Sequence, residues 1–444
     1  IIVPVIMTCG YNVPVLATAT RQLYSRARNF LYLPCCISNN MYGNSNILAL
    51  PLDWRWFRDF GGFEPQTPCL RPWSEILIFT GMKTAYKSFY VNIGAVVGKH
   101  DKIWTISMNE ESQKTPLVML HGLGAGLALW CPNLDAFAAS RPVYAIDLLG
   151  FGRSSRPKFS TDPYKVEDQW VESIEAWRRE MNISQFILLG HSLGGYISTL
   201  YSIKYPERVR HLIAADPWGY SEVTPELEER YRKMPIWVRA VGAALRPFNP
   251  MAIIRAAGPA GQWLISRGRA DISKKYMPII PDAETVIPEY IYQCNSQTPS
   301  GEAAFHTLLS RFGLAKNSLV PRLDQLHPSL PVTEIYGSKS WVPRCPEEVM
   351  KEKRPHSRRY PKVTDIVIEL AGHHIYLDRP EIFNEYVLEA CERADQYDPE
   401  IKAPLRPATN HKSEDNTAVA EDQSPISKVR SNPSLPTIVL NENL

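Results

Sequence analysis

A serine, Ser192, stands at the centre of the pentapeptide GHSLG. The apolar run at residues 186–189 precedes it and predicts a buried strand, and residues 195–205 follow it as a helix that ends at Pro206. The flanking glycines let two chain directions pass closely, so that the serine hydroxyl is exposed at a strained turn. The pattern predicts a nucleophile; the alternative is a glycine-rich turn whose serine does no chemistry.

A histidine, His373, follows directly after the apolar run at residues 365–370, which predicts the last major strand. A histidine at this point of the chain order is suited to act as a general base. Its imidazole would take the proton of Ser192 and return it to the leaving group. The alternative is a structural histidine in a loop.

The strand predicted at residues 116–120 runs into the glycine-rich segment HGLGAG at residues 121–126. Acyl transfer requires backbone N–H groups that point at the oxygen that becomes negative. This segment and the residue after the nucleophile are suited to supply them. We therefore predict an oxyanion hole formed by the amides of Leu123 and Leu193.

These residues require a sheet that brings several strand ends together. Further strands are predicted at residues 103–108, 141–147, 211–216 and 331–337, and an amphipathic helix at 166–181. Strands that alternate with helices indicate an α/β fold with a mostly parallel sheet and helices on both faces.

Residues 220–330 show no strong strand signal and predict an all-helical cap over the site. Helices are expected at residues 226–232, 237–245, 252–267 and, interrupted by Pro288, 283–292. Apolar residues suited to an acyl chain are Trp237, Leu245, Phe248, Ile253, Ile254 and Trp263. Arginines that either bind a lipid phosphate or form a solvated helix face are Arg239, Arg246, Arg255, Arg267 and Arg269.

The composition is that of an ordinary globular protein, with 44% hydrophobic residues. A formal net charge of +3 gives no indication of a nucleic-acid partner. The eight cysteines are scattered without metal-site spacing, which predicts reduced thiols in an intracellular compartment and no metal. No apolar run approaches the roughly 18 residues of a membrane helix, so a membrane partner would be met at its surface.

Two N-terminal segments have unusual compositions. Residues 1–52 contain no Asp or Glu but several Arg, which is similar to a mitochondrial transit peptide; a disordered extension is the alternative. Residues 51–79 combine aromatic residues with arginines, which suits a lipid–water interface or an arm packed on the main domain. The predicted organisation is an extension at 1–80, a hydrolase domain at 81–394 and a disordered tail at 395–444.

Several runs together resemble one family. They are RPVYA at 141–145, LLGFGRSSRP at 148–157, GHSLGG within 182–220, FNP at 248–250 and YIYQCNSQTPSGEAAF at 290–305. Over residues 73–391 the chain resembles the α/β-hydrolase-domain subfamily that groups a lyso-N-acyl-phosphatidylethanolamine lipase with the lipid-droplet co-activator of adipose triglyceride lipase. The co-activator branch carries Asn at the nucleophile position in vertebrates. Ser192 therefore makes the chain more similar to the catalytically competent branch.

The resemblance implies an α/β-hydrolase fold and a lipid-active serine hydrolase or acyltransferase without a cofactor. Its substrates would be acyl esters of phospholipids or lysophospholipids, in lipid homeostasis and phosphatidic acid metabolism. The expected location is the cytoplasm, on the surface of lipid droplets or the endoplasmic reticulum, with a mitochondrial location as the alternative. A second hypothesis is a catalytically weak lipid-droplet protein that recruits or activates a triglyceride lipase.

The family pattern also suggests an H-x-x-x-x-D motif, His373 to Asp378 here, proposed for lysophosphatidic acid acyl transfer. Asp378 has a structural alternative as a cap for the last helix, which is predicted at residues 378–390 with Pro380 in its first turn.

One departure concerns the acid of the triad. The family places it shortly after a Tyr-Gly strand end, where this chain has Tyr336-Gly337 followed by SKSWVP, with Pro343 at the position of the acid. Loss of the acid costs about 10⁴-fold in kcat in well-studied triads. We expect Asp216, at the end of the preceding strand, to replace it, with Glu347 as the second candidate.

Overall fold

The computed structural model describes residues 82–222, 229, 232–233, 250–258, 260–310, 313–345, 347–353 and 364–396. The predicted N-terminal extension, nearly all of the predicted tail and the cap helices expected at 226–232 and 237–245 therefore lie outside the described residues or almost entirely so. The predicted domain boundaries remain predictions.

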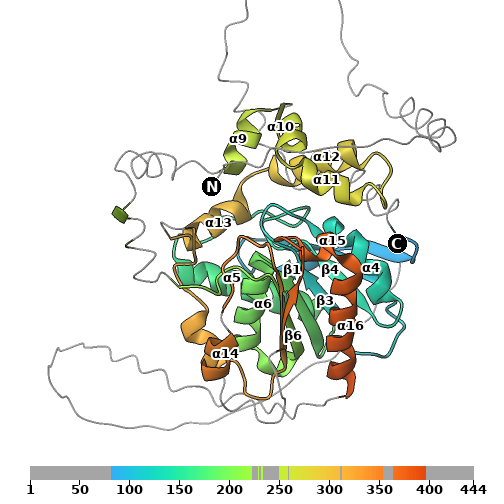
Figure 1. Ribbon diagram of the computed structural model, residues 1–444, viewed down its shortest axis with the longest axis vertical. Helices are drawn as coiled ribbons and strands as arrows, with labels where there is room; N and C mark the ends of the chain where they lie inside the picture. Colours follow the sequence, from blue (N-terminus) through green and yellow to red (C-terminus); the bar gives the residue numbers. More distant parts are fainter. Residues whose placement is uncertain are drawn as a thin grey trace, which may run out of the picture. The chain divides into compact units, whose positions relative to one another are not determined.

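An eight-stranded sheet forms the centre of the fold, with the strand order β1-β2-β4-β3-β5-β6-β7-β8 (Figure 1). The strands are β1 (Tyr86–Gly94), β2 (Asp101–Met108), β3 (Leu117–Leu120), β4 (Val143–Ile146), β5 (Phe186–His191), β6 (Val209–Ala215), β7 (Val332–Gly337) and β8 (Thr364–Ile368). β2 pairs antiparallel with β1 and β4, and the remaining neighbours pair in parallel. This arrangement confirms the predicted α/β-hydrolase fold.

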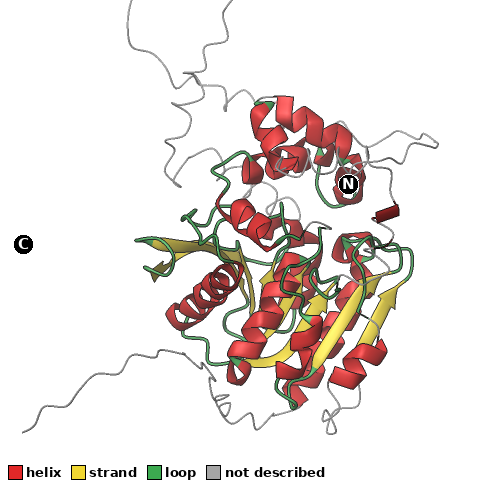
Figure 2. Ribbon diagram, turned by 90° about the vertical axis from the view of Figure 1, so that its left-hand side faces the viewer, coloured by secondary structure: helices red, strands yellow, loops and turns green. Residues whose placement is uncertain are grey.

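Helices cover both faces of the sheet (Figure 2). Because side chains alternate along a strand, Met119 of β3 joins one buried cluster and Val118 the other. The first cluster includes residues of α4 (Cys131–Ala138) and α16 (Pro380–Gln396). The second includes residues of α5 (Pro163–Glu180) and α6 (Leu193–Lys204).

α5 has the properties predicted for residues 166–181. Trp170, Ile174 and Trp177 are buried on the sheet, as its amphipathic pattern indicated. The helix begins after Asp162, whose carboxylate accepts hydrogen bonds from the amides of Tyr164 and Lys165. Its tryptophans are part of the core, not of a ligand site.

β1 was not predicted, although it forms a long antiparallel ladder with β2. Only Val91 and Ile93 are buried within it, so its apolar pattern is weak. Edge strands need to bury only part of one face, and their hydrophobic signal is correspondingly short. The strand is therefore specified by its hydrogen bonds to β2 and not by its own apolar pattern.

The cap lies between β6 and β7, and its described part is built mainly of helices. Its helices are α9 (Pro250–Ala256), α10 (Ala260–Gly268), α11 (Ala270–Tyr276), α12 (Ala283–Asn295) and α13 (Ser300–Leu308). The single helix expected at 252–267 is wrong, because the chain breaks at Gly258, which has a φ of +52°. The expected interruption at Pro288 is also wrong: α12 continues through this residue, and buried neighbours such as Ile287 and Tyr290 hold it in place.

The last helix differs from its predicted bounds. Residues Ile375–Asp378 form the single-turn helix α15, and α16 then starts at Pro380 and extends to Gln396. Arg141 is completely buried and forms an ion pair with Asp395 of α16, over a distance of 3.1 Å. This contact joins the end of the described chain to the start of β4.

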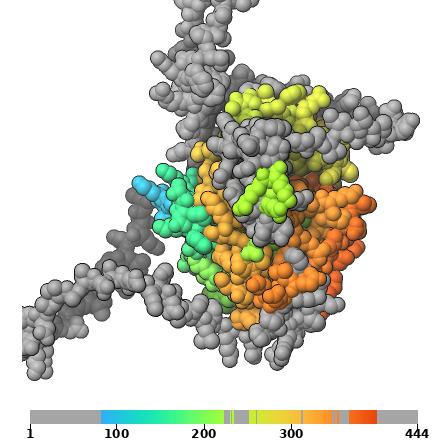
Figure 3. Space-filling model, turned by 60° about the vertical axis from the view of Figure 1, so that its left-hand side comes forward, coloured from blue at the N-terminus to red at the C-terminus, as the bar shows by residue number. Residues whose placement is uncertain are grey.

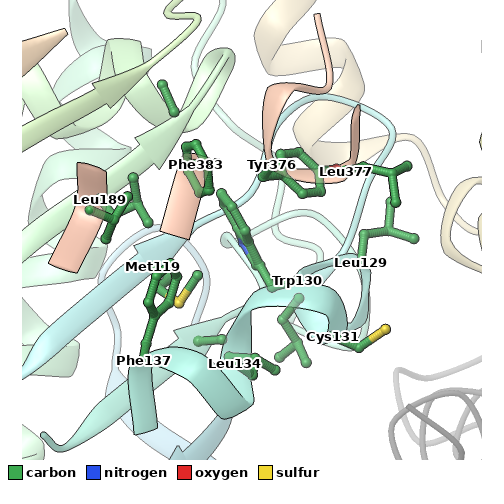
Figure 4. Close-up of a cluster of buried hydrophobic side chains, with 14 of the residues drawn as sticks. Met119, Leu129, Trp130, Cys131, Leu134, Phe137, Leu189, Tyr376, Leu377 and Phe383 are labelled. Atoms are coloured by element: carbon green, nitrogen blue, oxygen red, sulfur yellow. The ribbon is translucent and has the colours of Figure 1, made fainter. Parts of the chain in front are cut away.

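Aromatic side chains form the core beneath the strand ends. Trp130 lies between Tyr376 and Phe383 (Figure 4), with a distance of 4.5 Å between the Trp130 and Tyr376 ring centroids. Trp130 belongs to the short helix η2 (Leu127–Trp130), which follows the glycine-rich segment. The packing therefore connects that segment to the α15–α16 region. Within the described residues, no helix has the length and apolar character needed to cross a bilayer.

Candidate active site

Ser192 lies at a tight turn between β5 and α6. Its φ of 54° and ψ of −115° are strained for a residue with a side chain. A Cβ atom on Gly190 would lie 2.2 Å from the carbonyl oxygen of Gly194, and one on Gly194 would lie 2.4 Å from that of Leu120. The turn thus requires both glycines, as the sequence indicated.

His373 lies between Ser192 and Asp216. Its Nε2 atom is 3.0 Å from the Oγ of Ser192, and its Nδ1 atom is 2.5 Å from the Oδ2 of Asp216. A carboxylate accepts at Nδ1, so that nitrogen carries the proton and Nε2 is free to accept the serine proton. The structure therefore brings the three residues predicted as nucleophile, base and acid into one hydrogen-bonded relay.

Asp216 is completely buried, and its carboxylate has three donors. Besides His373, the Gly337 amide donates to Oδ1 over 3.2 Å, and the Ser340 hydroxyl donates to Oδ2. These donors stabilise a negative charge that has no access to water. Asp216 follows β6, whereas Gly337 and Ser340 lie at the end of β7, where the family pattern expects the acid itself.

The other positions considered for the acid do not take part in this relay. Pro343 is exposed and has no carboxylate. Glu347 begins the helix α14 (Glu347–Lys353), and its side chain lies outside the described part of the chain. Asp216, the first choice, is the carboxylate that contacts His373.

The predicted oxyanion segment packs against the nucleophile. A Cβ atom on Gly122 would lie 3.0 Å from the Cβ of Ser192, so the loop that continues to Leu123 approaches the serine closely. Leu193 is the first residue of α6, where an N–H group has no acceptor within the helix and the helix dipole favours negative charge. Both nominated amides therefore belong to segments adjacent to Ser192.

His121 stabilises the shape of this segment, a role the sequence did not reveal. Its Nδ1 donates to the Gly122 carbonyl over 2.8 Å, and its Nε2 accepts from the Leu148 amide over 3.0 Å. Burial lowers the pKa of His121, which keeps the ring neutral. Asp147, which follows β4, accepts from the Leu127 amide over 2.8 Å and therefore has a structural role.

His191, the residue before the nucleophile, was also missed. Its Nε2–H donates to the His373 carbonyl over 2.8 Å. Burial, followed by the proximity of His373, lowers the pKa of His191 well below its usual value. A neutral imidazole thus anchors the backbone of the predicted base, and only its place inside the GHSLG motif hinted at this role.

The cap contacts the oxyanion segment directly. The Nδ2 of Asn295 donates to the Gly124 carbonyl over 2.9 Å, and the Tyr290 hydroxyl accepts from the Ala128 amide over 3.2 Å. A Cβ atom on Gly124 would lie 2.9 Å from the methyl group of Met251 in α9. These contacts place α9 and α12 next to the predicted oxyanion hole.

The described cap arginines all have nearby partners. Arg255 forms an ion pair with Glu302, Arg269 pairs with Asp271 over 3.1 Å, and Arg267 lies over the ring of Trp263. Arg239 and Arg246 lie outside the described residues. Of the apolar residues proposed for an acyl chain, Ile253 and Trp263 are more than half exposed.

Asp378 does not contact Ser192. The alternative role as a cap of the last helix is also wrong, because its carboxylate has other partners. One carboxylate oxygen accepts from the Gly372 amide over 2.6 Å, and the other contacts the Lys275 ammonium group. Asp378 is the last residue of α15, and α16 starts only at Pro380. The carboxylate therefore contacts the preceding His373 loop and not the first turn of α16.

Among the described residues, no group of three His, Cys, Asp or Glu side chains is arranged to hold a metal ion. Cys131, Cys294, Cys345 and Cys391 are buried free thiols. Burial raises the pKa of Cys294 and of Cys391 to about 12, so these sulfurs are poor nucleophiles.

Comparisons with known proteins agree with the observed fold. The family model described as alpha/beta hydrolase fold matches residues 115–244. A crystal structure of a membrane phospholipase A, described as a bacterial virulence factor, is similar with a TM-score of 0.51 at 19% identity, covering 77% of this chain and 96% of that one. At this identity, the likeness concerns the fold alone.

Two curated human proteins are much more similar in sequence. The 1-acylglycerol-3-phosphate O-acyltransferase ABHD5 of Homo sapiens is 47% identical over 300 residues, which are 67% of this chain and 84% of that protein. The (lyso)-N-acylphosphatidylethanolamine lipase of Homo sapiens is 46% identical over 296 residues, which are 66% of this chain and 84% of that protein. The chain therefore belongs to the α/β-hydrolase family, in the subfamily that contains these two proteins.

Proposed function

We propose that the protein is a lipid-active serine hydrolase that cleaves acyl esters of phospholipids or lysophospholipids. The observation that carries the proposal is the relay from Ser192 through His373 to the buried Asp216. The relatives named as a lipase and as an acylglycerol-phosphate acyltransferase support a lipid acyl group as the substrate.

The first half-reaction forms an acyl-enzyme. His373 takes the proton of Ser192 as its Oγ attacks the ester carbonyl carbon, and the amides of Leu123 and Leu193 bind the oxygen that becomes negative. The bond to the leaving alcohol then breaks, and His373 gives that alcohol its proton. Asp216 keeps the Nδ1 proton in place and stabilises the imidazolium form.

The second half-reaction determines the product. Water attacks the acyl-enzyme and releases a fatty acid, or a lysophospholipid hydroxyl attacks it and becomes acylated. In both cases His373 accepts the proton of the attacking group and returns it to Ser192. A single acyl-enzyme on Ser192 thus allows this protein to act as a lipase, as a lysophosphatidic acid acyltransferase or as both. This chemistry requires no cofactor.

We place the site at the surface of a membrane or lipid droplet, where its substrates reside. In support, Ile253, Trp263, Leu264 and Met277 are exposed apolar residues of α9 to α11 and the turn after α11. This part of the cap is coloured yellow-green in Figure 3. A peripheral location on lipid droplets or the endoplasmic reticulum follows from this proposal, whereas a mitochondrial location depends on residues 1–52, outside the described residues.

Release of fatty acid from lysophospholipid vesicles tests the proposal. The wild-type protein is expected to release fatty acid, and Ser192→Ala is expected to release none while it retains its fold by circular dichroism. Addition of lysophosphatidic acid shows whether acyl transfer competes with hydrolysis. Equal activity of the wild type and Ser192→Ala would exclude the proposed nucleophile.

Recruitment of a triglyceride lipase remains the second candidate, because the sequence resembles the subfamily that includes a lipid-droplet co-activator of such a lipase. The absence of an acid at residue 343 supported it at the level of sequence, but Asp216 contacts His373 instead. A folded wild-type protein without hydrolytic or transfer activity would favour this candidate.

A further inference from the structure

The loop that carries His373 is held by groups from several parts of the chain. The Lys339 amide donates to the Ala371 carbonyl over 2.8 Å, and His191 donates to the His373 carbonyl. Between these two residues, the Gly372 amide donates to the Asp378 carboxylate. Three consecutive residues of the loop thus each have a backbone group fixed by a different partner.

Asp378 occupies its place because α15 is a single turn. The amides of Leu377 and Asp378 both donate to the His374 carbonyl over 2.9 Å, which turns the chain back toward Gly372. The Asp378 side chain is only 9% exposed. Its second oxygen contacts Lys275, so both carboxylate oxygens have partners.

Lys275 belongs to the cap, and its neighbour also binds the core. The Tyr276 hydroxyl donates to the Leu129 carbonyl over 2.5 Å, and its ring is fully buried. Two successive residues at the end of α11 therefore contact the hydrolase body, one beside the oxyanion segment and one beside the His373 loop.

We propose that Lys275 and Asp378 are positioning residues that couple the docking of α11 to the geometry of His373. The proposal rests on the proposed function for its catalytic consequence. When α11 lies on the core, Lys275 neutralises Asp378, and the carboxylate fixes the Gly372 amide one residue before the base. When Lys275 is removed, a nearly buried carboxylate loses its cation and turns toward water, which frees the amide.

This role differs from a chemical role of the H-x-x-x-x-D motif in acyl transfer. Asp378 contacts a backbone amide and a lysine rather than the reacting atoms. Its effect on hydrolysis and on transfer should therefore be equal, because both reactions use His373.

Amide hydrogen exchange of the full chain tests the link without relying on activity. Asp378→Ala is expected to increase exchange at residues 370–374 by about 10-fold or more, because the Gly372 amide loses its acceptor. Lys275→Met should increase it by a smaller factor, and Lys275→Arg should restore the wild-type rate. Exposed Lys274 on the same helix provides the control variant Lys274→Met, which should change nothing. Unchanged exchange in both Asp378→Ala and Lys275→Met would overturn the proposal.

Kinetics with a soluble short-chain ester provide the second readout. Asp378→Ala is expected to lower kcat about 10-fold with KM nearly unchanged, since the base is misplaced while the substrate site persists. Asp378→Asn keeps an acceptor for Gly372 and should recover most of kcat. Lys275→Met combined with Asp378→Asn should be no worse than either change alone, as expected for one shared link.

Failure of the positioning role and failure of the proposed function give different results. Loss of acyl transfer with intact hydrolysis in Asp378→Asn would assign the carboxylate a chemical role and overturn the positioning role. A wild-type protein inactive in every assay would refute the proposed function, whereas the exchange measurements would still decide whether the link to α11 exists.

Discussion

The backbone of the nucleophile turn and the backbone of the His373 loop are held in position by different interactions. At the turn, steric contacts between neighbouring segments determine the backbone: Gly190 and Gly194 have no room for a Cβ atom. At the loop, hydrogen bonds donated by Lys339 and His191 and one accepted by Asp378 hold successive residues. Local sterics can be recognised in a short motif, whereas long-range hydrogen bonds cannot.

Gly194→Ala should cause the largest loss. The new methyl group would lie 2.4 Å from the Leu120 carbonyl oxygen, so α6 and the oxyanion segment must separate. We expect a destabilisation of about 1–3 kcal/mol together with loss of detectable activity. Urea unfolding and ester hydrolysis measure the two effects. Gly268→Ala in α10 is the control, because a Cβ atom there has no neighbour within 4 Å; equal behaviour of the two variants would contradict the steric account.

Asp216→Asn should lower kcat by about 10⁴-fold while the fold is retained, as in other triads. The neutral amide occupies the same space, but it has no negative charge to stabilise the imidazolium form and holds the Nδ1 proton less firmly. Steady-state kinetics on a soluble ester measure the loss. A decrease below about 10-fold would mean that another group serves as the acid.

Most of the catalytic residues and most of the strands could be predicted from the sequence alone. Ser192, His373 and the oxyanion glycines stand in motifs that follow predicted strands, and strands β2 to β8 were recognised by their apolar runs. β1 was missed because it buries few residues. In the cap, whose helical character was predicted, two details were wrong: Gly258 breaks the helix expected at 252–267, and tertiary packing lets α12 continue through Pro288.

The supporting residues could not be predicted for a different reason. Ser340 and Gly337 bind Asp216 across more than a hundred residues of sequence, and Lys275 reaches Asp378 from the cap. Such contacts depend on how β6, β7 and α11 meet in space. No local pattern in the sequence specifies them.

His191→Phe should reduce kcat by about 10-fold, with little change in KM. Phenylalanine keeps an aromatic ring at this position, but the His373 carbonyl loses its hydrogen-bond donor. Leaving a buried acceptor without a donor costs about 1–3 kcal/mol of free energy. The loop would relax, so the His373–Ser192 contact becomes less populated. Kinetics on a soluble ester measure the effect, and His100→Phe at an exposed position serves as the control. An unchanged kcat would show that the loop does not need this anchor.

Acidification should lower the stability of the fold. His211 is buried in β6, where burial lowers its pKa to about 3, whereas the unfolded chain titrates near 6.5. Below pH 6.5 the unfolded state therefore binds more protons, and stability falls as pH decreases, by up to about 1.4 kcal/mol per pH unit for this group. His121 and His191 act in the same direction.

Urea unfolding at pH 7 and pH 5 measures this dependence. His211→Gln keeps a polar group near Thr333 but cannot be protonated, so its stability should fall less between the two pH values than that of the wild type. An identical decrease in both proteins would show that His211 is not responsible.

Labelling with a fluorophosphonate probe, followed by mass spectrometric mapping, tests the central claim most directly. The Ser192–His373–Asp216 relay predicts phosphonylation of Ser192 in the wild type, at least about 100-fold slower labelling in Asp216→Asn, and none in Ser192→Ala. A folded wild-type protein that is not labelled at Ser192, or an Asp216→Asn variant labelled at the wild-type rate, would contradict the account.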